Sequence, residues 1–143
     1  MIALQNNIPF IDTNVFLRYL VYDKVNPGLS KKAKKVFEGL ITGNLTVQTN
    51  ILVISEIFFV LHKFYGLAVG EVVEKISLLL NLENIIMEDK GKIIAALFLC
   101  ETKNVDFEDA YLYVDMLSCE CSSIYTFDKK HFSRFDDINI LDF

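Results

Sequence analysis

Apolar and polar residues alternate along the chain with two periods, one typical of strands and the other typical of helices. Apolar runs of strand length occupy residues 8–11, 45–48, 84–87, 123–127 and 138–141. Apolar residues at helical spacing occupy residues 15–22, 30–41, 50–65, 69–80, 90–103 and 107–118. Short apolar strands that alternate with helices favour a parallel sheet covered by helices on both faces. The pattern therefore predicts an α/β fold.

Several predicted helices begin next to a side chain that can cap them. Capping side chains accept hydrogen bonds from the first free backbone N–H groups of a helix. The expected caps are Ser30, Thr49 or Asn50, and Asp106. Residues 26–28, Asn-Pro-Gly, are expected to break the chain before the second helix, and Gly66 is expected to end the third.

The composition narrows the class of protein. The 143 residues are 52% hydrophobic, enough for a real core, and a single domain over residues 1–143 is expected. No apolar run reaches the roughly 18 residues of a membrane span. Residues 1–7 lack the basic and apolar segments of a secretory signal. The three cysteines, Cys100, Cys119 and Cys121, lack zinc-site spacing and are expected to be reduced thiols in a cytoplasmic protein.

Glu56 is a carboxylate within an apolar stretch of a predicted helix. Its neighbours three and four positions away on either side are all apolar, namely Leu52, Val53, Phe59 and Val60. The side chain is therefore expected to face inward, where a charge is costly unless it is paired or binds a metal. Pairing with a lysine or arginine of another element is an equal alternative.

Three aspartates stand at the ends of predicted elements, and each has a purely structural explanation. Asp12 ends the first strand and precedes a helix, which it can cap. Asp109 lies three residues after Asp106, the spacing of a capping box. Asp128 follows another strand, where a turn aspartate is common. Taken singly, none of the three requires a function.

Considered together, the four carboxylates predict a cation site. Asp12 and Asp128 close strands of the predicted parallel sheet. Asp109 opens a helix and Glu56 is expected to face inward, so all four can converge at one end of the sheet. Two carboxylates repel by roughly 4 kcal/mol at about 4 Å and an effective dielectric constant of about 20. Such a cluster requires bound protons or a cation, and oxygen ligands without histidine or cysteine select Mg²⁺ or Mn²⁺.

Four segments carry these residues in order. They are FIDTNVFLRYL at 10–20 with Asp12, ISEI at 54–57 with Glu56, VDFEDA at 105–110 with Asp109, and YTFDKKHF at 125–132 with Asp128. In order and spacing they resemble the motifs of the PIN-domain nucleases, and within them the VapC toxins of bacterial and archaeal toxin–antitoxin pairs. The resemblance extends over nearly the whole chain from about Ile8. One departure, Tyr111, Tyr113 and Val114 where many relatives have small residues, removes no carboxylate.

The resemblance implies a three-layer PIN-like fold, with a central parallel sheet of four to five strands flanked by helices. It also implies Mg²⁺- or Mn²⁺-dependent cleavage of single-stranded RNA. Asp12 and Asp109 would be the principal metal ligands, and Glu56 and Asp128 would complete the cluster directly or through water. Asn14 and Thr126 would orient a ligand or a water molecule. No histidine is assigned a role, so metal-activated water is the expected nucleophile, with a carboxylate assisting as base.

The same resemblance implies a homodimer and a small antitoxin protein as partner. A chain with 52% hydrophobic and 13% aromatic residues is expected to expose apolar surface that a partner can cover. The candidate helices contain Tyr19, Phe58, Phe59, Phe64 and Tyr65.

The net charge of −5 argues against a broad basic surface for duplex nucleic acid, since phosphate contacts dominate the affinity of duplex binders. A nucleic-acid contact is therefore expected to be local and bridged by a metal ion. Lys31, Lys32, Lys34 and Lys35 could contact the RNA backbone, but a solvated helix face is the favoured interpretation. The candidates for phosphate contacts are Arg18, Lys129, Lys130 and Arg134.

Three other functions share parts of this sequence pattern. A phosphatase of the haloacid-dehalogenase type also begins with a strand and an aspartate, but it needs a second aspartate where this chain has Asn14. A stand-alone RNA-processing PIN nuclease is an alternative within the enzyme class. A non-catalytic PIN interaction module is a further alternative, although degenerate relatives usually lose one carboxylate and this chain keeps all four.

Overall fold

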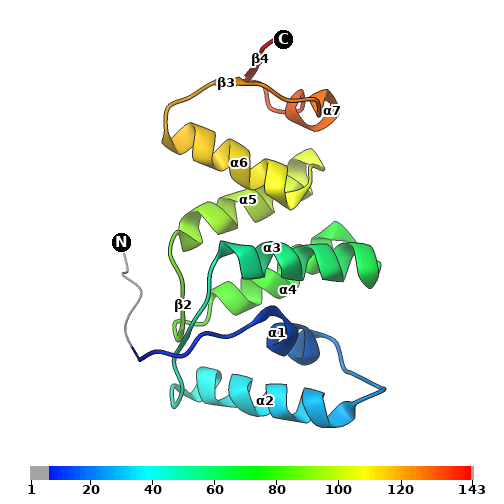
Figure 1. Cartoon of the computed structure of the whole chain (residues 1–143), viewed down its shortest axis with the longest axis vertical. Coiled ribbons are helices and arrows are strands. Elements are labelled where there is room, and N and C mark those ends of the chain that lie inside the picture. Colours follow the sequence, from blue (N-terminus) through cyan, green and yellow to red (C-terminus); the bar gives the residue numbers. More distant parts are fainter. Residues whose placement is uncertain (1–6, 143) are drawn as a thin grey trace. The chain divides into compact units, whose positions relative to one another are not determined.

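A computed structural model of the chain describes residues 7–142 (Figure 1). The chain forms two compact units, unit 1 over Met1–Lys90 and unit 2 over Gly91–Phe143. Unit 1 contains α1 (Thr13–Leu20), α2 (Pro27–Thr42), β1 (Val47–Gln48), α3 (Ile51–Phe59), the π-helix η1 (Val60–Phe64), α4 (Val69–Leu80) and β2 (Ile85–Ile86). The later elements are α5 (Lys90–Lys103), α6 (Phe107–Ser118), β3 (Ser123–Ile124), α7 (Lys129–Phe132) and β4 (Asn139–Ile140).

Short parallel strands accompanied by helices occur in both units, which confirms the predicted α/β class. The strands are shorter and less extensively paired than the expected sheet of four to five strands. Within residues 7–142 they form two parallel pairs, β1 with β2 and β3 with β4, each strand two residues long.

The sheet of unit 1 gains a third member through an isolated bridge between Phe10 and Gln48. The Ile11 N–H donates to the Gln48 carbonyl at 3.0 Å, and the Gln48 N–H donates to the Pro9 carbonyl at 2.9 Å. The predicted strand at residues 8–11 forms no longer ladder with β1, because Pro9 has no N–H to donate the next hydrogen bond. The chain still leaves this sheet at Asp12, as expected.

Helix α2 begins at Pro27, whereas the sequence predicted a break over residues 26–28 and a cap at Ser30. Proline suits the first position of a helix because its φ is preset and its missing N–H is not needed there. The buried Ser30 hydroxyl instead accepts a hydrogen bond from the Asp23 N–H at 2.8 Å. Ser30 therefore stabilises the loop before the helix and does not cap it.

Helix α3 begins as predicted but ends at Phe59, and the π-helix η1 continues the helical run to Phe64, close to the predicted end at about Tyr65. The Asn50 side chain accepts from the N–H groups of Leu52 and Val53, and Gly66 with φ +71° follows the π-helical continuation η1. The core of unit 1 packs α1, α2, α3 and α4 through fully buried side chains that include Phe16, Phe37, Ile54, Ile57 and Ile76. Phe37 contacts the Phe16 ring edge-on, with ring centroids 5.6 Å apart.

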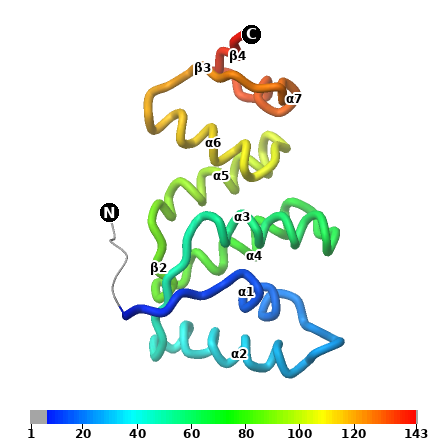
Figure 2. The backbone as a smooth tube through the Cα atoms, in the orientation of Figure 1, coloured from blue at the N-terminus to red at the C-terminus, as the bar shows by residue number. Residues whose placement is uncertain are grey.

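In unit 2 the predicted helices at 90–103 and 107–118 are confirmed as α5 and α6, and the chain turns back between them (Figure 2). Asn104, with φ +55°, lies in this turn, and asparagine tolerates the left-handed conformation. Helix α7 was not predicted. It is held by Phe132 and Phe135, both buried, and the Phe135 ring stacks on Tyr113 of α6 with centroids 3.9 Å apart.

None of the helices in the described part of the chain is long and apolar enough to cross a membrane.

The three thiols are expected to differ sharply in reactivity. Burial, assisted by the nearby Asp106 charge, raises the pKa of the Cys100 thiol to about 12, whereas Cys119 and Cys121 are exposed. Because the thiolate is the nucleophile, a disulfide reagent at pH 8 should modify two thiols in the folded protein and the third only after denaturation. A Cys119→Ser/Cys121→Ser variant should be inert while folded. Rapid modification of that variant would contradict the burial of Cys100.

Candidate functional site

In unit 1, Asp12 both ends the first sheet segment and caps α1. Its Oδ1 accepts a hydrogen bond from the Thr13 N–H at 2.7 Å, and the residue as a whole is exposed. The segment before it is attached to β1, because the fully buried Thr49 hydroxyl donates to the Ile11 carbonyl at 3.3 Å. The capping explanation of Asp12 is therefore correct, and it leaves Oδ2 without a role in the cap.

Glu56 is exposed, so the prediction that it faces inward is wrong. The buried face of α3 consists of Ile54, Ile57 and Phe58. Two of the apolar neighbours on which the prediction rested, Leu52 and Phe59, are themselves 75% and 57% exposed. In a helix that is apolar on nearly every side, spacing alone does not reveal which side meets the core. The desolvation argument for Glu56 no longer applies.

Thr13 links Glu56 to the start of α1. The Thr13 side chain is buried, and its hydroxyl donates to Glu56 Oε2 at 3.1 Å. Asp12 and Glu56 are thus held on either side of one threonine, Asp12 by the Thr13 N–H and Glu56 by the Thr13 hydroxyl. Asn14 is exposed and lines a cavity of about 320 Å³ together with Arg18 and Lys32.

In unit 2, Asp128 follows β3 and caps α7. Its Oδ1 accepts from the His131 N–H at 3.1 Å, and its own N–H donates to the Thr126 hydroxyl at 2.9 Å. Thr126 therefore shapes the turn that presents Asp128. Whether it also orients a ligand remains a prediction, as it does for Asn14.

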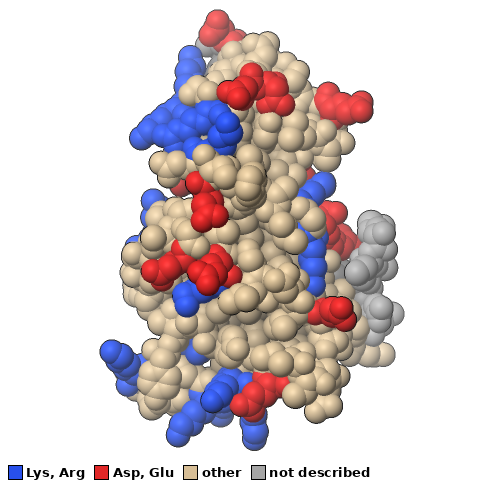
Figure 3. All heavy atoms as spheres, turned by 180° about the vertical axis from the view of Figure 1, so that it is seen from behind, with Lys and Arg blue, Asp and Glu red and all other residues tan. Residues whose placement is uncertain are grey.

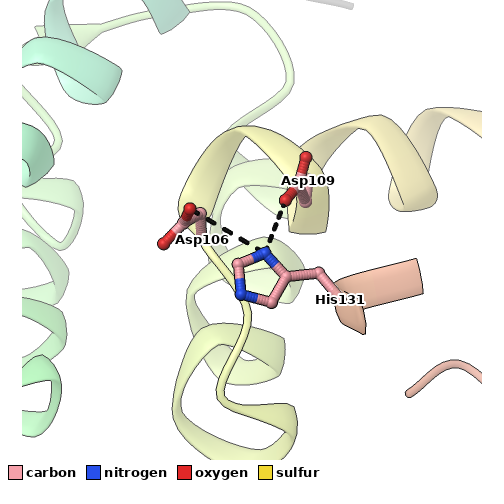
Figure 4. Close-up of side chains that lie close together, drawn as sticks. All are labelled: Asp106, Asp109 and His131. Carbon is pink, nitrogen blue, oxygen red and sulfur yellow. Dashed lines mark hydrogen bonds and ion pairs between the residues drawn. The ribbon is translucent and has the colours of Figure 1, made fainter. Parts of the chain in front are cut away.

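Asp106 precedes α6, but its side chain makes no capping hydrogen bond, so the predicted cap and capping box are wrong. Both carboxylates of that predicted box are directed instead toward the imidazole of His131 (Figure 4). His131 Nδ1 lies 3.0 Å from Asp109 Oδ2 and 3.8 Å from Asp106 Oδ2. The same nitrogen lies 3.0 Å from Asp128 Oδ2.

His131 is the site residue that the sequence analysis left without a role. It lies three residues after Asp128, which places both on one turn of α7. That spacing was available in the sequence, but the packing of α7 against α6, which brings His131 to Asp109, was not. The expectation of a cluster without histidine is therefore wrong for unit 2.

The two carboxylates nearest His131 have pKa values shifted in opposite directions. Burial raises the pKa of Asp109, and the Asp128 charge adds to this, while the hydrogen bond with His131 opposes it. The hydrogen bond from the His131 backbone N–H lowers the pKa of Asp128. Asp128 is therefore the more readily deprotonated of the two carboxylates. Asp109 is the one that a bound proton or cation stabilises more.

The unit 2 cluster has dimensions that suit a small divalent cation. Ligands at about 2.0–2.1 Å from an octahedral ion lie about 3 Å from their neighbours. One ligand atom each from Asp106, Asp109 and His131 lies within 4.8 Å of the others, and the closest of these contacts is 3.0 Å. Two carboxylates and an imidazole can therefore hold a metal ion with little movement.

Comparison with protein families gave one decisive result: the model of the PIN domain matches residues 10–138. The chain belongs to the PIN-domain family. PIN domains are generally nucleases and typically use divalent metals, which agrees with the carboxylate-rich cluster of unit 2. A comparison with characterised proteins found no match.

The PIN match extends across both units and includes Asp12, Glu56, Asp109 and Asp128. The structure associates Asp12 with Glu56 in unit 1, through Thr13. In unit 2 it associates Asp109 with Asp128, through His131.

The link between Thr13 and Glu56 can be tested by a double-mutant cycle of unfolding free energies. Thr13→Val keeps the buried shape and removes the hydroxyl, and Glu56→Ala removes its acceptor. The coupling free energy between the two changes should be about 0.5–1.5 kcal/mol, the usual net value of a hydrogen bond. Thr42→Val is the matched control, because its hydroxyl bonds only to carbonyls of its own helix. Strict additivity of Thr13→Val and Glu56→Ala would show that the bond contributes nothing.

Proposed function

We propose that this PIN domain is a Mg²⁺- or Mn²⁺-dependent endoribonuclease that cleaves single-stranded RNA. The observation that carries the proposal is the clustering of carboxylates at element ends within a PIN match that contains all four predicted acids. A bound proton or cation stabilises a cluster of this kind by offsetting its charge. The cytoplasm remains the expected compartment.

The proposed site residues are carboxylates of both units, and residues 1–143 are proposed to act as a single domain. The family match supports this set of residues, because it contains all four carboxylates. Asp12 and Asp109 would be the principal ligands, with Glu56 and Asp128 bound directly or through water. Asn14 and Thr126 would orient the water or the phosphate.

The reaction is the hydrolysis of a phosphodiester bond. When bound, the divalent ion neutralises the scissile phosphate and lowers the pKa of a bound water. A carboxylate of the cluster accepts a proton as the water oxygen attacks phosphorus. The bond from phosphorus to the 3′-oxygen breaks and that oxygen takes up a proton, so the products are a 3′-hydroxyl and a 5′-phosphate.

Cations near the cluster are suited to hold the RNA backbone. Lys129 and Lys130 are exposed and directly follow Asp128. Arg18 is a weaker candidate than expected, because its Nε lies 3.3 Å from Asp23 Oδ2. Figure 3 shows Lys and Arg side chains gathered at the α2 end of unit 1 and at the α7 end of unit 2. Lys129 and Lys130 can provide local contacts to a short single strand despite the net charge of −5.

We also propose that the chain is the toxin of a toxin–antitoxin pair and forms a homodimer. Exposed aromatic residues support this, since Tyr19, Phe59, Phe64 and Tyr65 all lie on the surface, although Phe58 is buried. A cavity of about 810 Å³ among α1, α2 and α4 is lined by apolar side chains and by Lys31, Lys34 and Lys75. Its chemistry fits a short amphipathic segment with acidic residues, as an antitoxin would provide.

Removing one ligand carboxylate should abolish RNA cleavage without unfolding the protein. In Asp109→Asn and Asp12→Asn, cleavage with saturating Mn²⁺ should fall by more than the roughly 10–100-fold that loss of a supporting group costs. Asparagine caps helices about as well as aspartate, so the change at position 12 should keep α1 intact. The measurement is the initial rate on a labelled single-stranded RNA, with EDTA as the metal-free reference.

The matched controls make the same chemical change outside the site. Asp136→Asn removes a highly exposed carboxylate of unit 2, and Asp89→Asn removes one of unit 1 at a φ of +58° that asparagine tolerates. Both should cleave at the parental rate. Parental rates in the Asp12 and Asp109 variants as well would refute the nuclease assignment of these residues.

Light scattering at micromolar concentration should give the mass of a dimer. Phe64 is 78% exposed, so Phe64→Ser should weaken a dimer that buries the η1 surface. Phe98→Ser, which alters an exposed aromatic residue of α5, is the control. A monomeric parent that co-purifies with no small protein from its native operon would favour the stand-alone processing nuclease.

A further inference from the structure

His131 occupies a position at which a structural histidine is not required. Its side chain is only 20% exposed, and one nitrogen, Nδ1, is directed at three carboxylates. Helix α7 is already capped through the His131 backbone N–H and anchored by the buried Phe132. The imidazole is therefore not needed to hold α7 in place.

We propose that His131 Nδ1 is a metal ligand, together with Asp106 and Asp109, and that it makes the site prefer first-row transition ions to Mg²⁺. The inference rests on the proposed function, because the ion concerned is the cofactor of the nuclease. It changes the expected ligand set in two ways. It adds a nitrogen where only oxygen was expected, and it recruits Asp106, which was expected only to cap a helix.

The carboxylate oxygens around His131 Nδ1 lie at distances that suit ligands of one ion. A proton on Nδ1 would be donated to Asp109 Oδ2 and Asp128 Oδ2, each 3.0 Å away. A cation that binds these oxygens can take the place of that proton, because metal binding to histidine requires the neutral ring. Asp106 Oδ2, at 3.8 Å from Nδ1, is free of any capping bond and can turn toward the same ion.

The selectivity follows from ligand chemistry. Mg²⁺ prefers oxygen ligands and retains its waters, whereas imidazole binds transition ions increasingly well from Mn²⁺ through Co²⁺ to Ni²⁺. A site of two carboxylates and one imidazole therefore gains affinity for Mn²⁺ and Co²⁺ relative to a site of carboxylates alone. The family's general use of divalent metals does not specify this preference.

The test compares two substitutions that differ in where they place an amide. His131→Asn puts an amide oxygen near the position of Nδ1, whereas His131→Gln puts it near Nε2. Calorimetric titration of the full chain with Mn²⁺, Co²⁺ and Mg²⁺ should show Mn²⁺ and Co²⁺ affinities lowered at least about tenfold in His131→Asn. Mg²⁺ affinity should change much less, because an oxygen ligand is retained. In His131→Gln, binding of all three ions should weaken.

A spectroscopic readout identifies the nitrogen ligand independently of affinity. The visible absorption bands of bound Co²⁺ should shift in His131→Asn and stay unchanged in His62→Asn. His62 is the matched control, because its Nδ1 lies 2.8 Å from the Leu67 carbonyl in unit 1. Asp106→Asn, which loses no capping bond, should weaken binding of all three ions. Circular dichroism and thermal unfolding check that each variant is folded.

The outcomes separate the inference from the proposed function. Unchanged Mn²⁺ to Mg²⁺ selectivity in a folded His131→Asn overturns the inference, even where the parent cleaves RNA. Tighter binding of every ion in that variant also overturns it, since His131 would then compete with the ion. Selective Co²⁺ and Mn²⁺ binding by a parent that cleaves no RNA supports the ligand assignment and refutes the nuclease.

Discussion

The mutual repulsion of carboxylates is the constraint around which the candidate site is organised. In unit 2, Asp109 and Asp128 both lie 3.0 Å from a single imidazole nitrogen, and their pKa values move in opposite directions. Two half-buried carboxylates this close to one another are stable only when a proton or a cation offsets part of their charge. The same requirement makes the cluster a candidate site for a cation.

Helix capping leaves one oxygen of an aspartate available for a second contact in this protein. Asp12 and Asp128 each use one carboxylate oxygen to cap a helix, which fixes the side chain in a single orientation. In Asp128 the second oxygen is thereby directed toward His131. A cap stabilises a helix by about 1 kcal/mol, so the fold itself holds these carboxylates in position. Asp106 differs from both, because its side chain makes no capping hydrogen bond and is positioned only by the surrounding backbone.

Much of the local structure could be predicted because its causes are local. The bounds of α4, α5 and α6 follow from apolar residues at helical spacing, and the Asn50 cap follows from side-chain chemistry a few residues away. Motif order was likewise sufficient to indicate the PIN family, which the match over residues 10–138 shows. Strand lengths were not predictable in the same way, because the length of a strand depends on how far the neighbouring strand pairs with it. The pairing of the first segment with β1 ends at Pro9, which has no N–H to donate.

The sequence by itself determined which carboxylates are present, in what order, and at which element ends they stand. Only the tertiary structure decided what each of them faces. Glu56 lies on the exposed side of an almost wholly apolar helix, because the core of unit 1 takes the Ile54 and Ile57 side. His131 reaches Asp109, 22 residues earlier in the chain, because Phe132 and Phe135 bury their rings within unit 2. Periodicity reports contacts within one element, whereas the contents of a site depend on contacts between elements far apart in sequence.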